Sequence, residues 1–248
     1  MNSKLDIARL KGKASKIALG LQYVPQSRAR LCRCCQRMSI VVSFSDGEER
    51  KICLRCRANL RYEMLADAIR SFNPTLEEKT VLELDSRSPL RPLLSAAKLY
   101  HRSFYSSRER LGSFDSSGAR CEDITRLTFP PSSIDLIVSS DVLEHVPNVE
   151  DAFKECHRVL RPGGCHLFTV PPRARTRRRA QVVMGEIQFL EEPDYHSDPL
   201  DPKGILAFWD FGTDATELFS SSGLDVSIVS GPEGKDQRLV WKASKPHL

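Results

Sequence analysis

Residues 134–171 constrain the fold more than any other stretch of this sequence. "IDLIVSSD" (134–141) is a nearly continuous apolar run, which is typical of a strand buried on both faces. "NVEDAFKECHRVL" (148–160) places Val149, Ala152, Phe153, Cys156 and Leu160 on one helical face, and "CHLFTVP" (165–171) is apolar again. We expect "RPGG" to end the helix with Gly at a left-handed cap. The order predicts two parallel strands joined by a crossover helix.

The same alternation extends through most of the chain. The periodicity predicts helices over 60–72, 90–98 and 214–223. It predicts strands over 80–85, 99–106 and 118–123, with a closing strand pair over 224–231 and 237–243. We therefore expect an α/β fold over residues 61–248, with a mainly parallel seven-stranded sheet covered on both faces. Residues 171–210 read as an irregular, substrate-side insertion.

Residues 1–30 read as a basic leader, either surface-packed or disordered, with a mitochondrial transit peptide as the alternative. Residues 1–60 hold 13 Lys or Arg and 4 Asp or Glu, a net charge of +9, while the other 188 residues net −4. This asymmetry indicates an anionic partner near the N-terminus or a solvated basic surface. Eight cysteines without a secretion signal favour reduced thiols and a cytoplasmic protein, and no apolar run reaches the ~18 residues of a membrane span.

Two CxxC pairs within residues 31–60 predict a small zinc ribbon. The pairs stand 17 residues apart, a spacing typical of a tetrahedral four-thiolate zinc site whose ligands would be Cys32, Cys35, Cys53 and Cys56. "DG" at 46–47 predicts the tip of the hairpin between them. So small a module needs its metal to fold, so the Zn²⁺ would be structural. Cys34 leaves the ligand register open, and unligated core cysteines or a redox pair are the alternatives.

"VLELD", "CEDITRLTFPPSSIDLIVSSDVLEHV" and "ECHRVLRPGG" carry a family resemblance. Over about ninety residues, 81–172, the chain resembles class I S-adenosylmethionine-dependent methyltransferases of the type 11 branch, whose fold is Rossmann-like. "PDYHSDPL" and "FGTD…LFSSSGL" are similar to a subgroup found with sugar and polysaccharide biosynthesis, in which a cysteine pair often precedes the domain. The resemblance implies S-adenosylmethionine as cofactor and methyl transfer to an oxygen or nitrogen.

The resemblance also implies where the cofactor would bind. Glu83 would anchor the amino end of the methionine moiety, beside the turn of Asp85, Ser86 and Arg87. Asp123 would meet the adenine amino group, with Ile124 packed nearby. Ser140 and Asp141 would line the cofactor trough, and Glu144 and His145 would lie beside the transferred methyl group.

Two departures from the family pattern leave the activity open. The family has glycine where this chain has Asp85 and Arg87, and a non-glycine residue in a left-handed turn costs ~1–2 kcal/mol. Phe104 stands where relatives carry the acid that binds the ribose hydroxyls. Asp85 could instead face the cofactor's ammonium or sulfonium, and Arg87 its carboxylate. The alternative is a catalytically inactive, methyltransferase-like binding protein.

The acceptor side of the site is expected in the insertion. His196 and His145 are candidate general bases, because a neutral imidazole titrates near working pH, with Asp194 and Asp198 placed to orient His196. Structural roles for both histidines are the alternative. The arginine-rich run at 173–179 indicates either an anionic acceptor, small-molecule or glycan-type, or a solvated loop. Nucleic acid is less favoured, since few aromatic residues interleave. The candidate acceptor residues are Arg173, Arg175, Arg177, Tyr195 and His196.

Overall fold

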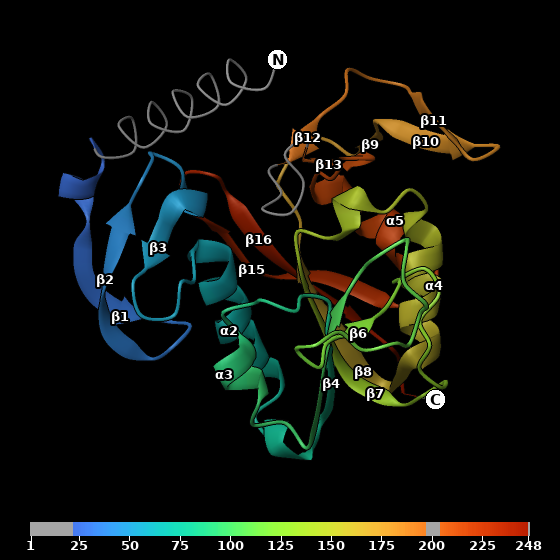
Figure 1. The fold of residues 1–248 in the computed structure, drawn as a ribbon, viewed down its shortest axis with the longest axis horizontal. Helices are drawn as coiled ribbons and strands as arrows, with labels where there is room; N and C mark the ends of the chain where they lie inside the picture. Colours follow the sequence, from blue (N-terminus) through green and yellow to red (C-terminus); the bar gives the residue numbers. More distant parts are fainter. Residues whose placement is uncertain (1–21, 197–203, 248) are drawn as a thin grey trace.

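The computed structural model describes residues 22–196 and 204–247 of the chain. An α/β core and a small N-terminal β module lie side by side (Figure 1). Residues 1–21 of the predicted leader, and Asp198, lie outside the described residues. Among the helices of the described chain, none combines the length and apolar character needed to cross a membrane.

The central sheet has seven strands in the order β15-β16-β8-β7-β4-β5-β6. Strands β4 to β8 of this sheet are parallel to one another, whereas β16 is antiparallel to β8 and β15 to β16. The predicted α/β fold with a mainly parallel seven-stranded sheet is confirmed. The strands are β4 (Thr80–Glu83), β5 (Leu99–Phe104), β6 (Arg120–Cys121), β7 (Ile134–Ser140), β8 (Leu160–Thr169), β15 (Asp225–Glu233) and β16 (Arg238–Ser244).

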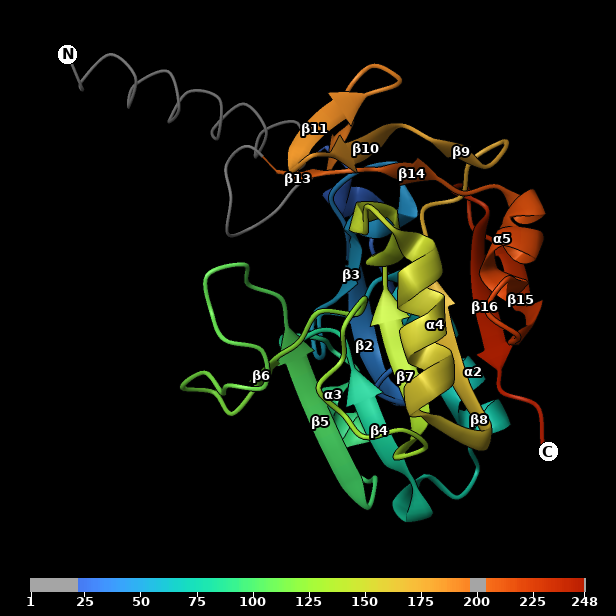
Figure 2. The same cartoon turned by 90° about the vertical axis from the view of Figure 1, so that its right-hand side faces the viewer.

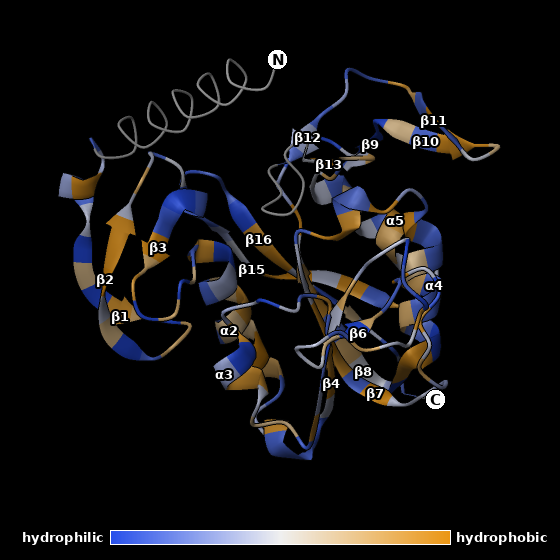
Figure 3. Ribbon diagram, in the orientation of Figure 1, coloured by the Kyte–Doolittle hydropathy of each residue, from blue (hydrophilic) through white to orange (hydrophobic). Residues whose placement is uncertain are grey.

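Helices cover both faces of this sheet, as its apolar strands require. On one face α2 (Leu60–Phe72) and α3 (Arg91–Leu94) share a core with Leu136 and Val138 of β7. On the other face α4 (Val149–Val159) and α5 (Thr216–Ser220) share a core with Ile137. Figure 2 shows α4 lying across β7 and β8, and Figure 3 shows the apolar residues concentrated on the strands between the helix layers. The near-continuous apolar run of β7 is thus buried on both sides.

The N-terminal module is a three-stranded antiparallel sheet formed by β1 (Arg28–Cys32), β2 (Arg37–Ser43) and β3 (Lys51–Cys53). The predicted hairpin across residues 38–52 is the β2–β3 pair. Five short 3-10 helices complete the described connections, namely η1 (Val24–Gln26), η2 (Glu48–Arg50), η3 (Leu76–Glu78), η4 (Leu143–His145) and η5 (Thr213–Ala215).

Two local expectations were wrong. Helix α4 ends at Val159, because Leu160 is already extended with ψ 137°; the left-handed glycine, Gly163, lies within β8 rather than at the helix end. The insertion is also more regular than expected. Its hairpins are β10 (Ala180–Val183) with β11 (Glu186–Phe189) and β12 (Tyr195–His196) with β13 (Ile205–Leu206), and β9 (Arg177–Arg178) pairs with β14 (Trp209–Asp210). Short strands carry too few residues for an alternation to stand out in sequence.

Candidate cofactor and acceptor site

The predicted cofactor residues gather at one edge of the sheet. β4 ends at Glu83, β5 at Phe104 and β7 at Ser140, and Asp123 follows β6 by two residues. These four strands are parallel neighbours, so their carboxyl ends share the edge at which open α/β folds bind ligands.

Glu83 is the most deeply placed of these residues, with 1% of its surface exposed. The Tyr100 hydroxyl donates a hydrogen bond to its carboxylate. Burial raises the pKa of Glu83 to about 7, although hydrogen bonds from Ser88 and Tyr100 oppose the shift. Glu83 can therefore hold or release a proton near neutral pH.

The glycine-free turn after β4 is closed by its own side chains. Asp85 Oδ1 accepts a hydrogen bond from the Arg87 backbone N–H at 2.7 Å, and Oδ2 accepts one from the Tyr62 hydroxyl at 2.9 Å. Ser88 Oγ accepts one from the Leu90 N–H at 2.9 Å. None of residues 85–88 has a positive φ. The expected cost of forcing non-glycine residues into a left-handed turn does not arise, because an Asx turn replaces that backbone shape.

The adenine and ribose positions differ in what they offer. Asp123 Oδ1 accepts hydrogen bonds from the Thr125 N–H at 2.9 Å and from its hydroxyl at 2.7 Å, and Ile124 beside it is buried. Phe104 ends β5 half-buried, and its ring has no group that could bind a ribose hydroxyl. The edge thus offers a carboxylate at the position predicted for the adenine and no acceptor at the position predicted for the ribose.

Asp141 is held by a charge network that the sequence did not reveal. Its carboxylate accepts hydrogen bonds from Arg61 of α2 at 2.5 Å, from Arg238 of β16 at 2.9 and 3.1 Å, and from the Thr169 hydroxyl at 2.8 Å. Glu49 pairs with both arginines, at 3.1 and 2.7 Å. Burial alone would raise the pKa of Asp141, but the two guanidinium groups hold it below its usual range. Ser140, next to Asp141, lies 3.3 Å from the Thr169 hydroxyl.

The structure brings the two predicted histidines together. The rings of His145 and His196 are 4.9 Å apart, edge to face, and both lie beside the buried carboxylate of Glu144. Asp194 Oδ2 is 3.8 Å from His196 Nε2, on the opposite side of that ring from Glu144. Burial raises the pKa of Glu144, and interaction with Glu144 raises the pKa of His196.

Most arginines of the insertion already have carboxylate partners. Arg173 and Arg177 both pair with the buried Asp210, at 3.2 and 2.7 Å, and Arg179 pairs with the same residue at 2.8 Å. Arg178 lies near Glu150 and over the ring of Trp209. Arg175 has no carboxylate partner among the described residues, and Tyr195 is 51% exposed. The pairs around Asp210 hold the insertion together internally, and the Arg178–Glu150 contact joins it to α4.

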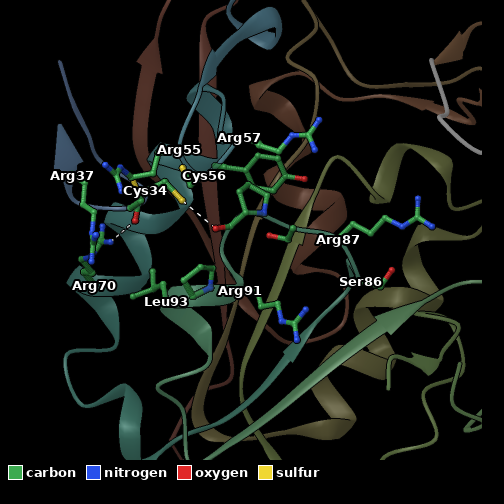
Figure 4. Close-up of a pocket in the computed structure, with 15 residues that line it drawn as sticks. Cys34, Arg37, Arg55, Cys56, Arg57, Arg70, Ser86, Arg87, Arg91 and Leu93 are labelled. Carbon is green, nitrogen blue, oxygen red and sulfur yellow. Dashed lines mark hydrogen bonds between the residues drawn. The ribbon is translucent and has the colours of Figure 1, made fainter. Parts of the chain in front are cut away.

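Six arginines, most of them without a carboxylate partner among the described residues, gather around a hollow of about 980 Å³ between the cysteine module and the turn after β4 (Figure 4). We call this the arginine hollow. Cys34 and Tyr62 border it, and no acidic side chain is among its lining residues in the described chain. Its arginines are Arg37, Arg55, Arg57, Arg70, Arg87 and Arg91, of which only Arg70 has a carboxylate within ion-pair distance, Asp67 at 3.6 Å. The hollow is a strongly positive, open surface.

The four predicted zinc ligands converge. The sulfurs of Cys32, Cys35, Cys53 and Cys56 all lie within 4.8 Å of one another, and those of Cys32 and Cys56 are 3.6 Å apart. Two thiolates bound to one tetrahedral Zn²⁺ at ~2.3 Å are about 3.8 Å apart, so the cluster fits the ion. Cys34 is not one of these four, and its thiol lies 3.6 Å from the Pro89 carbonyl oxygen. This contact joins the cysteine module to the turn after β4.

The strand order and its mainly parallel pairing are those of the Rossmann-like fold of class I methyltransferases. More particularly, residues 99–168 match the family model of the type 11 methyltransferase domain.

Two curated relatives and one solved structure illustrate the likeness. A Mycolicibacterium smegmatis protein named "Probable S-adenosylmethionine-dependent methyltransferase" is 28% identical over 109 residues, 44% of this chain and 35% of that one. A ubiquinone biosynthesis O-methyltransferase of Coxiella burnetii is 28% identical over 114 residues, 45% of each chain. The chain therefore spans less than half the length of these relatives. An S-adenosylmethionine-dependent methyltransferase of Mesorhizobium loti superposes with a TM-score of 0.48 at 18% identity, over 73% of this chain and 97% of that one.

Proposed function

We propose that this protein transfers a methyl group from S-adenosylmethionine to an oxygen or nitrogen atom of an anionic small-molecule or glycan-type acceptor. The observation that supports it most is the convergence of Glu83, Asp123 and the Glu144–His145 segment at the carboxyl edge of the sheet. The family match covers the strands and the crossover that carry Phe104, Asp123 and Glu144.

The residues present fit the two ends of the cofactor. Glu83, buried and ionisable near neutral pH, would accept a hydrogen bond from the ammonium of the methionine moiety. Asp123 keeps one carboxylate oxygen free of the Thr125 bonds for the adenine amino group, with Ile124 as the apolar neighbour. The bound cofactor supplies an electrophilic methyl group, and the chain's part is to orient it and exclude water.

Because Phe104 stands at the position expected to bind the ribose, we expect weak binding of S-adenosylmethionine. Relatives hold both ribose hydroxyls with an acid that is Phe104 here, and each hydrogen bond to a charged group contributes ~1.5–3 kcal/mol. We expect a dissociation constant ten-fold or more above that of a protein with the acid.

The arginine hollow supports an anionic acceptor. Arg87 belongs to both the hollow and the turn after β4, so a phosphate or carboxylate held there lies next to the proposed methionine site. Guanidinium groups pair with such oxyanions in two-pronged hydrogen bonds. The proton of the acceptor's hydroxyl or amine would leave toward the Glu144, His145 and His196 cluster.

The cysteine cluster supports a structural zinc ion as the second bound group. Arg30 and Arg33, which flank Cys32, bond to the buried Glu63 of α2, and Cys34 rests on Pro89. Zinc would fix the two CxxC turns and, through these contacts, α2 and the turn after β4.

One observation favours a second function, binding without catalysis. Arg61 and Arg238 saturate the Asp141 carboxylate, which is expected to line the cofactor trough. In that case the arginine hollow would bind an anionic partner directly.

Calorimetry with S-adenosylmethionine and S-adenosylhomocysteine tests the proposal. We expect saturable binding of both by the purified protein. Glu83→Gln should weaken it about ten-fold, because a charged hydrogen bond becomes neutral. Glu78→Gln, an exposed site in η3, should leave it unchanged. Absence of heat and of a thermal shift at millimolar cofactor would refute the methyltransferase and leave the binding function.

A further inference from the structure

Glu144, His145 and His196 form a compact cluster at the acceptor side of the site. One ligand atom from each, a carboxylate oxygen and two ring nitrogens, lies within 4.8 Å of the others. Glu144 and His145 come from η4, and His196 comes from β12, about fifty residues later. Backbone hydrogen bonds tie the segments together, from the Phe208 N–H to the Glu144 carbonyl at 2.7 Å and from the Ala207 N–H to the Asp194 carbonyl at 2.8 Å. The three side chains are therefore held in place by the fold.

The carboxylate of Glu144 lacks the partners that a buried charge needs. Glu144 is 1% exposed, and neither of its carboxylate oxygens has a hydrogen bond within the described chain. A buried carboxylate without a hydrogen bond or counter-charge is strongly destabilising. A cation bound beside the two histidines would remove this cost.

His145 presents a lone pair to this carboxylate. Its Nδ1 lies 2.8 Å from the Leu206 carbonyl oxygen, which can only accept, so Nδ1 carries the proton. In the neutral ring Nε2 is then unprotonated, and it lies 3.6 Å from Glu144 Oε1. A ring N–H fixed on a backbone carbonyl is the usual support for a metal-binding histidine.

His196 meets the same oxygen from the insertion. Its Nδ1 is 3.6 Å from Glu144 Oε1, and its Nε2 faces Asp194 Oδ2 at 3.8 Å. Asp194 is itself bound by Arg173 at 2.9 Å. Nδ1 is thus the ring nitrogen that faces the cluster, and in the tautomer with the proton on Nε2 it can bind an ion, with Asp194 as the neighbour of the Nε2–H.

We propose that Glu144, His145 and His196 bind a divalent transition-metal ion, of which Zn²⁺ is the expected occupant. The two nitrogen–oxygen distances of 3.6 Å are too long for hydrogen bonds. Two ligands about 2.1 Å from one tetrahedral ion are separated by about 3.4 Å, so the spacing suits atoms that share a metal. The ion would place a positive charge in contact with the buried carboxylate.

The metal also indicates the acceptor's class, a step that depends on the proposed methyl transfer. Three protein ligands leave coordination positions open, as in catalytic zinc sites. A hydroxyl bound there loses its proton more readily, because the cation stabilises the alkoxide. We therefore expect an acceptor whose reacting hydroxyl stands beside a second oxygen able to bind the metal, such as a vicinal diol or a 2-hydroxy acid. With Glu144, His145 and His196 acting as ligands, the hydroxyl would release its proton to water. The oxygen would then bond to the methyl carbon while the carbon–sulfur bond breaks and S-adenosylhomocysteine leaves as a neutral thioether.

Metal analysis tests the site independently of the cofactor. The purified full chain, equilibrated with micromolar Zn²⁺ and freed of excess metal, should hold two equivalents, one at the cysteine cluster and one here. Co²⁺ titration separates the two, because a thiolate site gives intense charge-transfer absorption and a nitrogen–oxygen site gives only weak visible bands.

Three variants make the assignment specific. His196→Ala and Glu144→Gln should each lose one equivalent of Zn²⁺ and the weak Co²⁺ bands, with affinity reduced about 100-fold or more, while the thiolate absorption stays. His157→Ala, a histidine on α4 outside the cluster, should retain both equivalents. Glu144→Gln also tests folding, since it removes the unpaired charge and should not lower the melting temperature of the metal-free protein.

The proposal is overturned if the wild-type chain binds one equivalent only, if a second ion binds only at millimolar concentration, or if both cluster variants retain two. A protein with two equivalents but no heat with S-adenosylmethionine would support the metal site and refute the methyl transfer. A protein that holds one equivalent of Zn²⁺ but gives heat with S-adenosylmethionine would refute the metal site and support the methyl transfer.

Discussion

Asp141→Asn removes the negative charge that joins α2 and β16 to the end of β7. The aspartate side chain is 9% exposed and that of Arg238 is 7% exposed, so the pair is largely desolvated, whereas Arg61 is 22% exposed. Breaking a buried ion pair from one side costs ~3–5 kcal/mol, because a charge is left without its partner. Glu49 remains bound to both arginines, so we expect a loss of about 2–4 kcal/mol in the free energy of unfolding.

The loss in the free energy of unfolding caused by Asp141→Asn should decrease as the pH falls. The arginines hold the pKa of Asp141 below its usual range in the folded protein. Its stabilising contribution is therefore complete above the unfolded pKa of ~3.9 and is lost as the pH falls through the lower folded value. The difference between wild type and Asp141→Asn should be full at neutral pH and should shrink below about pH 4, where the unfolded chain begins to bind a proton that the folded carboxylate still excludes.

Urea unfolding followed by circular dichroism measures both quantities. Asp151→Asn is the matched control, because its ion pair with Lys154 is solvent-exposed and contributes ~0–1 kcal/mol. A loss below 1 kcal/mol at neutral pH, or an equal loss at pH 3, would refute the structural reasoning about this network.

Three further results are expected. Cys53→Ser should abolish zinc binding at the cysteine cluster and lower the melting temperature, whereas Cys34→Ser, outside the cluster, should keep the metal, as counted by elemental analysis. Phe104→Asp should tighten S-adenosylmethionine binding about ten-fold in calorimetry, because it restores an acceptor for ribose hydroxyls; unchanged or weaker binding would contradict the placement of the ribose at the end of β5. Arg57→Ala combined with Arg87→Ala should weaken pyrophosphate binding about ten-fold at fixed ionic strength, and equal binding would show that the arginine hollow is not an anion site.

Most of the core was predictable because its elements have strong periodicity. The α2 range was predicted to the residue, and β7 and α4 to within a residue or two, since long apolar patterns identify buried faces. The insertion was not predictable in this way. Its strands are two to four residues long, and their positions depend on ion pairs around Asp210 that no local pattern encodes.

The candidate site was predictable where motifs are local and not where charges meet across the chain. The CxxC spacing was enough to bring four sulfurs together. In contrast, Asp141 is 80 residues from Arg61 and 97 from Arg238 in sequence, and a single sequence contains no signal for that pairing. Tyr62 was missed for the same reason, although it closes the turn through Asp85.

The turn at residues 85–88 has a consequence for the unfolded chain. Glycine samples far more backbone conformations than aspartate or arginine, so a glycine turn loses more entropy when it folds. Here the shape is set by Asp85 and Ser88 hydrogen bonds to backbone N–H groups, without left-handed residues. Restoring the family's glycines would relieve no strain and would add ~0.4–1 kcal/mol of entropic cost at each position. The substitutions therefore give this edge of the sheet a stiffer loop, and a simple reversion to glycine would loosen it.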